Sequence, residues 1–306
     1  MSKCILLFSG GLDSLIAYHV LKRASVSSII PVYMETPFFP ADKAIEAAEK
    51  NSIPLEIYDV FDAYRDILID PRYGYGKNLN PCIDCHGFMI NTGLEMMDVL
   101  GADFIATGEV IGQRPMSQNR SAFNAMNKLI KNPEKILRPL SAKLMEPTQM
   151  ETSGLVERDK LLDIQGRGRK RQMSLADRFG IADYHNPGGG CLLTYAGSAK
   201  KFRLLIKHGL LTRRNAIAVK DSRVIEMEQS IALLGRNREE NTLLIKRYPD
   251  CKVWMIDHMK GPAGVILGDP SDNDRRQFRD LIIQYSKGSD NENEIVAVDS
   301  NSVDFN

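Results

Sequence analysis

Residues 4–14, CILLFSGGLDS, decide the fold of this chain. The apolar run at residues 4–8 is too short for a buried helix and is typical of a strand buried on both faces of a parallel sheet. The segment after SGGLDS has apolar side chains at helical spacing, beginning with Leu15 and Ile16. The pattern therefore predicts that SGGLDS is the turn between a buried strand and a helix.

Such a turn is suited to binding an anion. Gly10 and Gly11 allow the backbone to approach a ligand closely, and the free N–H groups and dipole at the start of a helix attract negative charge. Asp13 would repel a phosphate there, unless a Mg²⁺ ion bridges its carboxylate to a pyrophosphate. The turn matches neither GxxxxGK[ST] nor GxGxxG. The alternative interpretation is an ordinary glycine-rich turn in which Ser and Asp act as caps.

SGGLDS resembles the signature of the PP-loop ATP pyrophosphatases, which cleave ATP to AMP and pyrophosphate and leave an adenylated substrate. The resemblance implies an α/β fold with a doubly wound parallel sheet, of the adenine nucleotide α-hydrolase type. It also implies that ATP and Mg²⁺ bind at the turn, through Ser9, Gly10, Gly11, Asp13 and Ser14.

Two further strand ends should meet this turn, because ligands of a doubly wound sheet lie beyond the carboxyl ends of its strands. Met34 ends the second predicted strand, and residues 34–38 are a candidate adenine pocket; alternatively, the aromatics of this loop pack on the core. Gly108 ends the fourth predicted strand, in TGE at residues 107–109, and should lie beside SGGLDS.

Composition bounds the class of protein. The chain has 306 residues, which allows two domains, and its 43% hydrophobic and 26% charged residues are typical of a globular protein. A net charge of +1 excludes a global basic field, so any nucleic-acid contact must be local. The apolar run near the start of the chain is too short for the core of a signal peptide. The five cysteines do not have the spacing of a disulfide-rich scaffold. We expect a cytoplasmic protein that does not enter a membrane.

Three cysteines are candidates for chemistry. Cys82 and Cys85 form a CxxC in NPCIDC at the predicted start of a helix, where the dipole should favour thiolates, and Cys191 follows three glycines. A CxxC by itself fits half a zinc site, a redox pair or part of an iron–sulfur site. His86 or His185 could add a nitrogen ligand.

SGGLDS, NPCIDC, TGEVIGQ and LRPLSAK, in this order within residues 1–195, resemble the tRNA thiouridine synthetases of the PP-loop superfamily. TGEVIGQRPMSQ is similar to the 4-thiouridine synthetases, and NPCIDC with a distant second cysteine resembles the 2-thiouridylases. In these enzymes ATP adenylates a uridine carbonyl oxygen, and sulfur then displaces AMP. The resemblance implies catalytic roles for Asp13, Cys82 and Cys191, with tRNA as partner and sulfide, a cysteine desulfurase or a sulfur carrier as donor.

The third cysteine resembles the subset of these enzymes in which three cysteines hold a 4Fe-4S cluster, which implies Cys82, Cys85 and Cys191 as ligands. The alternatives are a persulfide on Cys191 or Cys82, and, less favoured, zinc. A cation must also neutralise the developing phosphate charge, and Lys143, Arg138 and Arg114 are equal candidates.

Two basic segments are candidates for RNA contacts. The first consists of Arg167, Arg169, Lys170 and Arg171; the alternative is solvated surface. The second contains Arg236 and Arg238, in a predicted α+β domain at residues 199–286 that resembles the NFACT-type RNA-binding domain through GRN, Trp254 and His258. The alternative here is a generic accessory domain.

Within that domain, residues 215–227 should form two strands with a turn at residues 220–222. The acidic, polar residues 287–306 should be a disordered tail.

The sequence thus predicts a two-domain tRNA sulfurtransferase that makes 2- or 4-thiouridine. The alternatives are a PP-loop enzyme that forms AMP while acting on a small molecule, in sulfur transfer for cofactor synthesis or in amide ligation, and an RNA-binding adaptor with a vestigial nucleotide site. The sequence leaves the thiolated position, the sulfur donor and the oligomeric state open.

Overall fold

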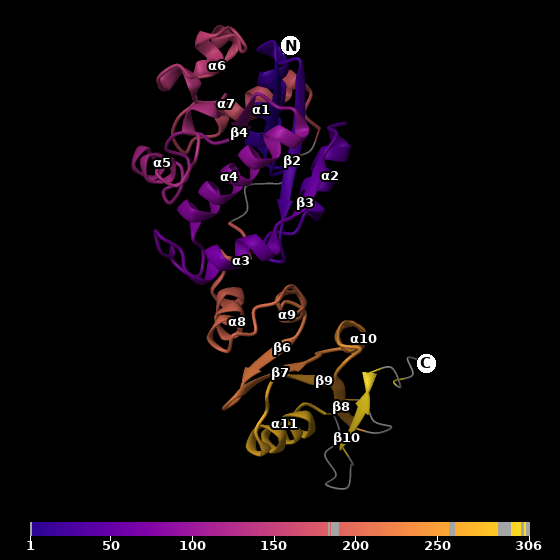
Figure 1. Ribbon diagram of the computed structural model, residues 1–306. Coiled ribbons are helices and arrows are strands. Elements are labelled where there is room, and N and C mark those ends of the chain that lie inside the picture. The colour runs from indigo at the N-terminus through magenta and orange to yellow at the C-terminus, as the bar shows by residue number, and fades with distance from the viewer. Residues whose placement is uncertain are drawn as a thin grey trace. The chain divides into compact units, whose positions relative to one another are not determined.

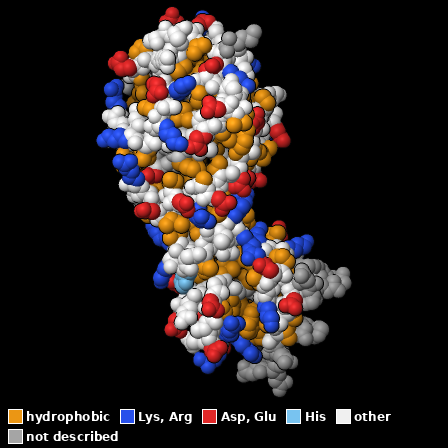
Figure 2. Space-filling view, viewed as in Figure 1, with side chains coloured by type: hydrophobic (Ala, Val, Ile, Leu, Met, Phe, Trp, Pro, Cys, Tyr) orange, Lys and Arg blue, Asp and Glu red, His pale blue; other side chains and the backbone are white. Residues whose placement is uncertain are grey.

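The computed structural model describes residues 2–182, 184, 190–256, 261–286, 295–300 and 303 (Figure 1). The chain divides into two compact units, Met1–Thr194 and Tyr195–Asn306. No helix of the described residues is long and apolar enough to cross a membrane. On the face that Figure 2 shows, Lys and Arg alternate with Asp and Glu, in keeping with the near-zero net charge.

A five-stranded parallel sheet of order β3-β2-β1-β4-β5 forms the centre of the first unit, which confirms the predicted doubly wound α/β fold. The strands are β1 (Lys3–Leu7), β2 (Ser28–Glu35), β3 (Glu56–Asp59), β4 (Phe104–Thr107) and β5 (Ile136–Leu137). Leu7, at the end of β1, lies opposite Val32 on one side and Thr107 on the other. The strand order reverses beside β1, so a ligand crevice is expected at the carboxyl ends of β1 and β4.

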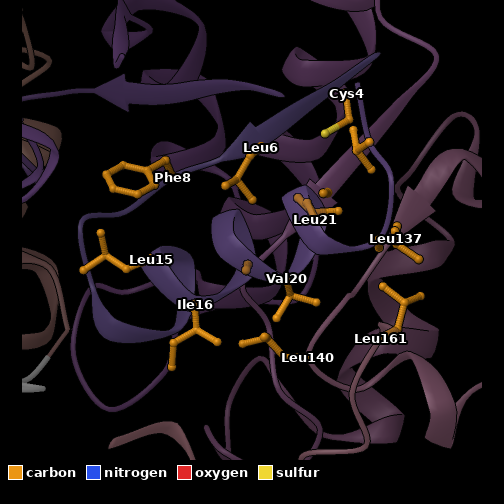
Figure 3. Close-up of a cluster of buried hydrophobic side chains, with 14 of the residues drawn as sticks. Cys4, Leu6, Phe8, Leu15, Ile16, Val20, Leu21, Leu137, Leu140 and Leu161 are labelled. Atoms are coloured by element: carbon orange, nitrogen blue, oxygen red, sulfur yellow. The ribbon is translucent and has the colours of Figure 1, made fainter. Parts of the chain in front are cut away.

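Helices cover both faces of this sheet (Figure 1). They are α1 (Leu12–Arg23), α2 (Asp42–Lys50), α3 (Phe61–Ile69), α4 (Cys82–Leu100), α5 (Arg120–Asn127), α6 (Gln149–Thr152) and α7 (Lys170–Phe179). Successive side chains of β1 point to opposite faces of the sheet, and both faces are buried, which explains the continuous apolar run of this strand. Cys4, Leu6 and Phe8 belong to the core formed with α1, shown in Figure 3, whereas Ile5 belongs to the core formed with α4.

The second unit is an α+β fold with an antiparallel sheet of order β10-β8-β9-β7-β6. Its strands are β6 (Arg223–Glu226), β7 (Ser230–Leu234), β8 (Lys252–Ile256), β9 (Gly264–Gly268) and β10 (Ile295–Asp299). Its helices are α8 (Ala196–Lys207), α9 (Arg213–Ala218), α10 (Arg238–Arg247) and α11 (Asp272–Tyr285). Trp254 of β8 packs edge-on against Phe278 of α11, with ring centroids 5.8 Å apart.

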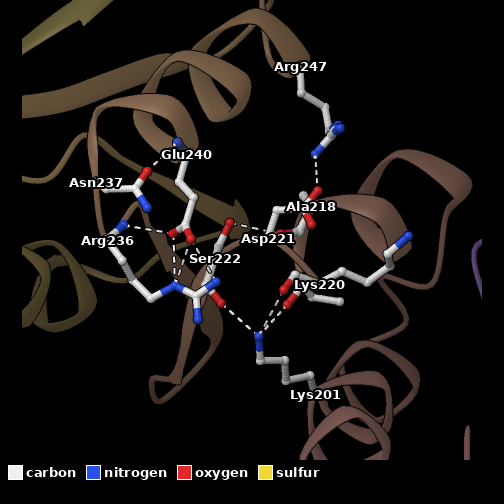
Figure 4. Close-up of polar contacts among 10 residues, drawn as sticks. Lys201, Ala218, Lys220, Asp221, Ser222, Arg236, Asn237, Glu240 and Arg247 are labelled. Carbon is white, nitrogen blue, oxygen red and sulfur yellow. Dashed lines mark hydrogen bonds and ion pairs between the residues drawn. The ribbon is translucent and has the colours of Figure 1, made fainter. Parts of the chain in front are cut away.

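The turn after α9 is held by one lysine (Figure 4). The ammonium group of Lys201 donates to the carbonyl oxygens of Val219, at 2.6 Å, and Ser222, at 2.8 Å. A cation at the C-terminal end of a helix satisfies carbonyls that have no partner within the helix and complements its dipole. Burial lowers the pKa of Lys201, and the neighbouring Arg236 lowers it further.

Two predictions for the second unit are wrong. Residues 213–218 are helix α9 where a strand was expected, because the Thr212 hydroxyl caps the helix by accepting a hydrogen bond from Asn215 N at 3.2 Å.

The second wrong prediction concerns the tail, of which residues 295–299 form β10, paired with β8. The Ser300 hydroxyl anchors its end by donating to the carbonyl oxygen of Cys251 at 2.7 Å. The strand escapes a composition-based prediction because its pairing partner lies some 40 residues away in sequence. Residues 287–294 lie outside the described part.

Candidate functional site

A cavity of about 470 Å³ opens at the carboxyl ends of β1, β2 and β4. The SGGLDS turn and the cysteine segments both line it. The lining includes, from these two sources, Ser9, Asp13, Ser14, Cys82, Cys85 and Cys191. We call these two walls the SGGLDS side and the cysteine side. The structure thus brings together two motifs that are far apart in the sequence.

The SGGLDS turn requires its first glycine. Gly10 has a φ of +71°, and a Cβ at this position would lie 2.6 Å from Cα of Ala44. Helix α1 begins directly after Gly11, and the Ser14 hydroxyl donates to the carbonyl oxygen of Gly11 at 2.8 Å. The predicted strand–turn–helix is confirmed, with Gly10 and Gly11 shaping the turn and Ser9 and Ser14 lining the cavity.

Gly108 allows the end of β4 to approach this turn. A Cβ on Gly108 would lie 2.9 Å from the backbone nitrogen of Ser14 and 3.0 Å from the carbonyl carbon of Asp13. Any larger side chain would push the turn and the strand apart. The prediction that residues 107–109 lie beside SGGLDS is therefore confirmed.

The Asp13 carboxylate is oriented by side chains from distant segments. Its Oδ2 accepts a hydrogen bond from Gln113, whose Oε1 in turn accepts one from Gln172 at 3.0 Å. Arg169 Nη2 lies 3.8 Å from the same Oδ2. Burial raises the pKa of Asp13, while Gln113, Arg169, Gln172 and Arg114 oppose that rise.

The other oxygen of Asp13, Oδ1, is buried and has no hydrogen-bond partner among the described residues. A buried carboxylate oxygen without a partner is costly, and a cation would satisfy it. The Asp13 carboxylate therefore fits the predicted Mg²⁺ ion. Gln113 and Gln172 were missed as functional residues; Gln113 stands in the TGEVIGQ motif, but nothing in the sequence near Gln172 signals its role.

The basic residues of segment 167–171 lie in different surroundings. Arg169 has only 21% of its side chain exposed and reaches Asp13, whereas Arg171 forms a surface ion pair with Asp163 at 2.5 Å. Arg167 and Lys170 are exposed. Of the four residues predicted to bind RNA here, Arg169 thus lies at the candidate nucleotide site.

The cysteine side is formed by the start of α4 and by the segment before residues 192–194, a short 3-10 helix. Burial raises the pKa of Cys191 to about 11 and raises that of Cys85 well above its usual value. The negative charges of the other two thiolates would oppose ionisation of Cys85, and that of Cys82 would oppose ionisation of Cys191. The expectation that the helix dipole favours thiolates is therefore wrong for Cys85, because desolvation outweighs the dipole.

The three thiols share one cavity but do not form a ready metal site. Among the described residues, no three His, Cys, Asp or Glu side chains are arranged to hold a metal ion. The donor chemistry nonetheless fits an iron–sulfur cluster, since three cysteines face one space. His86 is engaged elsewhere, and His185, the other proposed nitrogen ligand, lies outside the described residues.

A buried ion-pair group links the two sides of the cavity. Glu109 accepts a hydrogen bond from Arg138 Nε at 2.9 Å and one from His86 Nδ1 at 2.8 Å. Burial alone would raise the pKa of Glu109, but Arg138 and His86 hold it at about 2. Glu109 was missed as a site residue, although it stands in the TGE motif.

The contacts of the three candidate cations distinguish between them. Arg138 is committed to Glu109, and Lys143 donates to the carbonyl oxygen of Asp159 at 2.9 Å. Arg114 is exposed and lines the cavity. Of the three, Arg114 is the one placed to meet a phosphate.

Residues 34–38, at the end of β2 and in the loop after it, agree in part with both interpretations, an adenine pocket and a core-packing loop. Met34 lines the cavity, as a nucleotide pocket requires. Phe38 is fully buried and packs against Phe61, with ring centroids 6.0 Å apart, as expected of a core residue.

In the second unit, the predicted RNA-binding Arg236 forms an ion pair with Glu240 at 2.7 Å (Figure 4). Asn237 caps α10 by accepting a hydrogen bond from Glu240 N at 2.9 Å, which fixes this arrangement. Arg238 begins α10. His258, part of the NFACT-type pattern, lies outside the described residues.

Comparison with known proteins gives several relatives named tRNA-specific 2-thiouridylase. The tRNA-specific 2-thiouridylase MnmA of Desulfosudis oleivorans is 30% identical over 109 residues, which are 33% of this chain and 30% of that protein. The MnmA of Clostridium acetobutylicum is 31% identical over 35% of both chains. The MnmA of Bartonella quintana is 26% identical over 215 residues, 63% of this chain and 48% of that protein. The chain spans about a third of the length of the first two relatives and about half of the third.

Two solved structures show weaker likeness. A predicted subunit of tRNA methyltransferase from Methanocaldococcus jannaschii has a TM-score of 0.31 and 17% identity, over 45% of this chain and 68% of its own. The U34-tRNA thiolase NcsA of Methanococcus maripaludis, solved with its [4Fe-4S] cluster, has a TM-score of 0.33 and 13% identity, over 71% of this chain and 70% of its own. Likeness at this level bears on neither the fold nor the function of this chain.

No family model matches the chain, so the resemblance of the second unit to the NFACT-type domain stays a prediction. The relatives do confirm that part of this chain is similar to tRNA thiouridine synthetases, and specifically to tRNA-specific 2-thiouridylases.

Proposed function

We propose that this protein is an ATP-dependent tRNA sulfurtransferase, which adenylates a carbonyl oxygen of a uridine and replaces that oxygen with sulfur. The observation that carries this proposal is the shared cavity, with an SGGLDS turn on one side and three cysteines on the other. ATP activates the carbonyl oxygen and sulfur attacks the carbon bonded to it, so both groups are needed in one space.

The SGGLDS side would perform the activation. Ser9, Gly10, Gly11, Asp13 and Ser14 would bind the pyrophosphate and Mg²⁺, with the orphaned Oδ1 of Asp13 turned to the ion. Met34 and Gly108 would border the adenosine. Arg114 and Arg169 would neutralise charge as ATP is cleaved to AMP and pyrophosphate.

The cysteine side would deliver sulfur, with Cys82 and Cys191 as the residues that handle it. With a pKa of about 11, Cys191 is protonated at neutral pH, and a protonated thiol is a poor nucleophile. A 4Fe-4S cluster held by Cys82, Cys85 and Cys191 would keep all three as thiolates and offer an open iron for sulfide. The raised pKa values therefore support a cluster over a persulfide.

The partners follow from this chemistry. The names of the relatives support C2 of a tRNA uridine as the position that receives sulfur. Sulfide itself, a cysteine desulfurase or a sulfur carrier would supply the sulfur. Residues 199–286, with Arg236 and Arg238, would help to hold the RNA, as would Arg167, Lys170 and Arg171 on the surface of the first unit.

Nucleoside mass spectrometry of bulk tRNA, from cells with and without this protein, tests the proposal. We expect one thiouridine to disappear without the protein, to return with the wild-type chain, and to stay absent with Asp13→Asn. An unchanged profile in a strain without a redundant thiolase would contradict the proposal and favour an AMP-forming enzyme that acts on a small molecule.

A further inference from the structure

A glycine-rich loop at residues 70–80, DPRYGYGKNLN, connects α3 to the start of α4 and has no role in the chemistry above. It exposes two aromatic rings, with Tyr73 37% exposed and Tyr75 39% exposed. The guanidinium group of Arg72 lies 5.9 Å from the centre of the Tyr73 ring, and Lys77 is exposed on the same loop. Exposed aromatic rings beside cations are typical of surfaces that bind single-stranded nucleic acid.

The loop is held in place by buried contacts. The carboxylate of Asp84, which is 5% exposed, accepts the backbone N–H of Arg72 at 2.8 Å and of Tyr73 at 3.0 Å. The Tyr75 hydroxyl donates to the carbonyl oxygen of Leu68, at the end of α3, at 2.6 Å. The backbone at Tyr73 and the side chain of Tyr75 are therefore positioned before any ligand arrives, which lowers the entropic cost of binding.

The same loop borders the cysteine side. Asn78 donates to the carbonyl oxygen of Thr194 at 2.8 Å, and Leu79 N donates to that of Leu193 at 3.1 Å. Asn80 lines the cavity and donates to Cys82 Sγ at 3.2 Å. The loop thus joins the segments that carry Cys82 and Cys191, and it ends at Asn80 in the wall of the cavity where the sulfur would be delivered.

We propose that Tyr73 and Tyr75 are a stacking platform for the bases next to the target uridine in a single-stranded RNA loop, with Arg72 and Lys77 contacting the phosphates. This inference rests on the proposed function. A uridine paired and stacked in a duplex cannot reach into a cavity, so it must be unstacked from its neighbours. The two tyrosines would restore part of the stacking energy that those neighbours lose.

A hairpin RNA with a uridine in its loop, and the fluorescent base 2-aminopurine beside it, tests the platform. For Tyr73→Leu with Tyr75→Leu we expect a loss of affinity of roughly thirtyfold or more, because stacking on an aromatic ring contributes about 1–3 kcal/mol per base and two rings are removed. The quenching of 2-aminopurine on binding should be lost as well. In thiolation assays KM for the RNA should rise while kcat stays.

Three variants separate stacking from damage to the fold. Tyr73→Phe keeps the ring and should behave as wild type. Tyr73→Leu alone leaves the Tyr75 anchor intact and should show part of the loss. Ile57→Ala removes exposed apolar surface from β3, where Ile57 is 42% exposed, and should change nothing.

Unchanged affinity and quenching in the double variant would overturn the platform, as would equally tight binding of a duplex RNA by the wild type. The proposed function fails separately. If the wild type binds the hairpin through these tyrosines but thiolates no tRNA, the platform stands and the sulfurtransferase proposal falls. If the double variant thiolates tRNA with the KM of the wild type, the platform falls and the sulfurtransferase proposal stands.

Discussion

The SGGLDS side and the cysteine side of the cavity are prepared to different degrees. On the SGGLDS side, Gly10, Gly108 and the hydroxyl of Ser14 set the turn in its final geometry, and Asp13 is already aimed by Gln113. On the cysteine side, the thiols face one space but are not arranged as metal ligands, and Cys191 is held protonated by burial. One side is therefore preorganised for its ligand, whereas the other requires a ligand to become reactive.

Cys191→Ala should separate the two sides most sharply. We expect thiouridine formation to be abolished, because the cysteine side loses a residue that we propose handles sulfur, while tRNA-dependent release of pyrophosphate from ATP persists. Product analysis by mass spectrometry and a pyrophosphate assay measure the two steps. Cys251→Ala, in the second unit, is the control and should retain both. Loss of pyrophosphate release in Cys191→Ala would show that the sides are not independent.

Asp13→Asn should act on the SGGLDS side. It keeps the size of the side chain but removes the charge that would hold Mg²⁺, and we expect the rate of pyrophosphate release to fall about 10²–10³-fold. Asp163→Asn, which removes a surface carboxylate paired with Arg171, should leave that rate unchanged. Equal rates for Asp13→Asn and the wild type would refute a role for Asp13 in binding Mg²⁺.

Glu109→Gln tests the group that links the sides. Breaking a buried ion pair costs about 3–5 kcal/mol in the free energy of unfolding, whereas Glu95→Gln, which breaks an exposed pair with Lys131, should cost at most about 1 kcal/mol. The pKa of Glu109 is lowered from 4.5 to about 2, so its contribution is complete above pH 4.5 and is lost as the pH falls towards 2.

Denaturant unfolding at several pH values measures both effects. Two results would contradict this account. One is that Glu109→Gln and Glu95→Gln lower the free energy of unfolding equally at neutral pH. The other is that the loss for Glu109→Gln is the same at pH 2 as at neutral pH.

The reactivity of Cys191 should give the smallest effect. In metal-free protein, alkylation by iodoacetamide should quicken by roughly tenfold for each pH unit and level off only near the pKa of about 11. Peptide mass spectrometry after timed alkylation measures this. A plateau below pH 9 would mean that the thiol is already activated without a ligand, and that the two sides do not differ as described.

The sequence predicted what depends on neighbouring residues. The strand, turn and helix at residues 3–23 follow from a short apolar run, two glycines and helical spacing, all within one segment. It did not predict contacts between residues that are far apart in the sequence. Arg169 meets Asp13 across more than 150 residues, and a run of basic residues is indistinguishable from solvated surface until the fold is known. The same holds for Glu109, whose partners His86 and Arg138 belong to other elements.

The pKa values of the thiols could not be predicted from the sequence either. The start of a helix is visible in the sequence and favours a thiolate, but the burial of Cys85 is a property of the whole fold and acts the other way. Strand β10 was hidden for a similar reason, since its acidic, polar flanks outweigh a short apolar run until β8 is available as a partner.

One measurement tests most directly the claim that both sides serve one reaction. Purified protein, loaded with iron and sulfide under anaerobic conditions, is mixed with ATP, Mg²⁺, sulfide and a tRNA transcript without modifications, and AMP, pyrophosphate and thiouridine are counted together. The account predicts that AMP, pyrophosphate and thiouridine appear in equal amounts. Cleavage of ATP without thiouridine, or thiouridine without AMP, would contradict it.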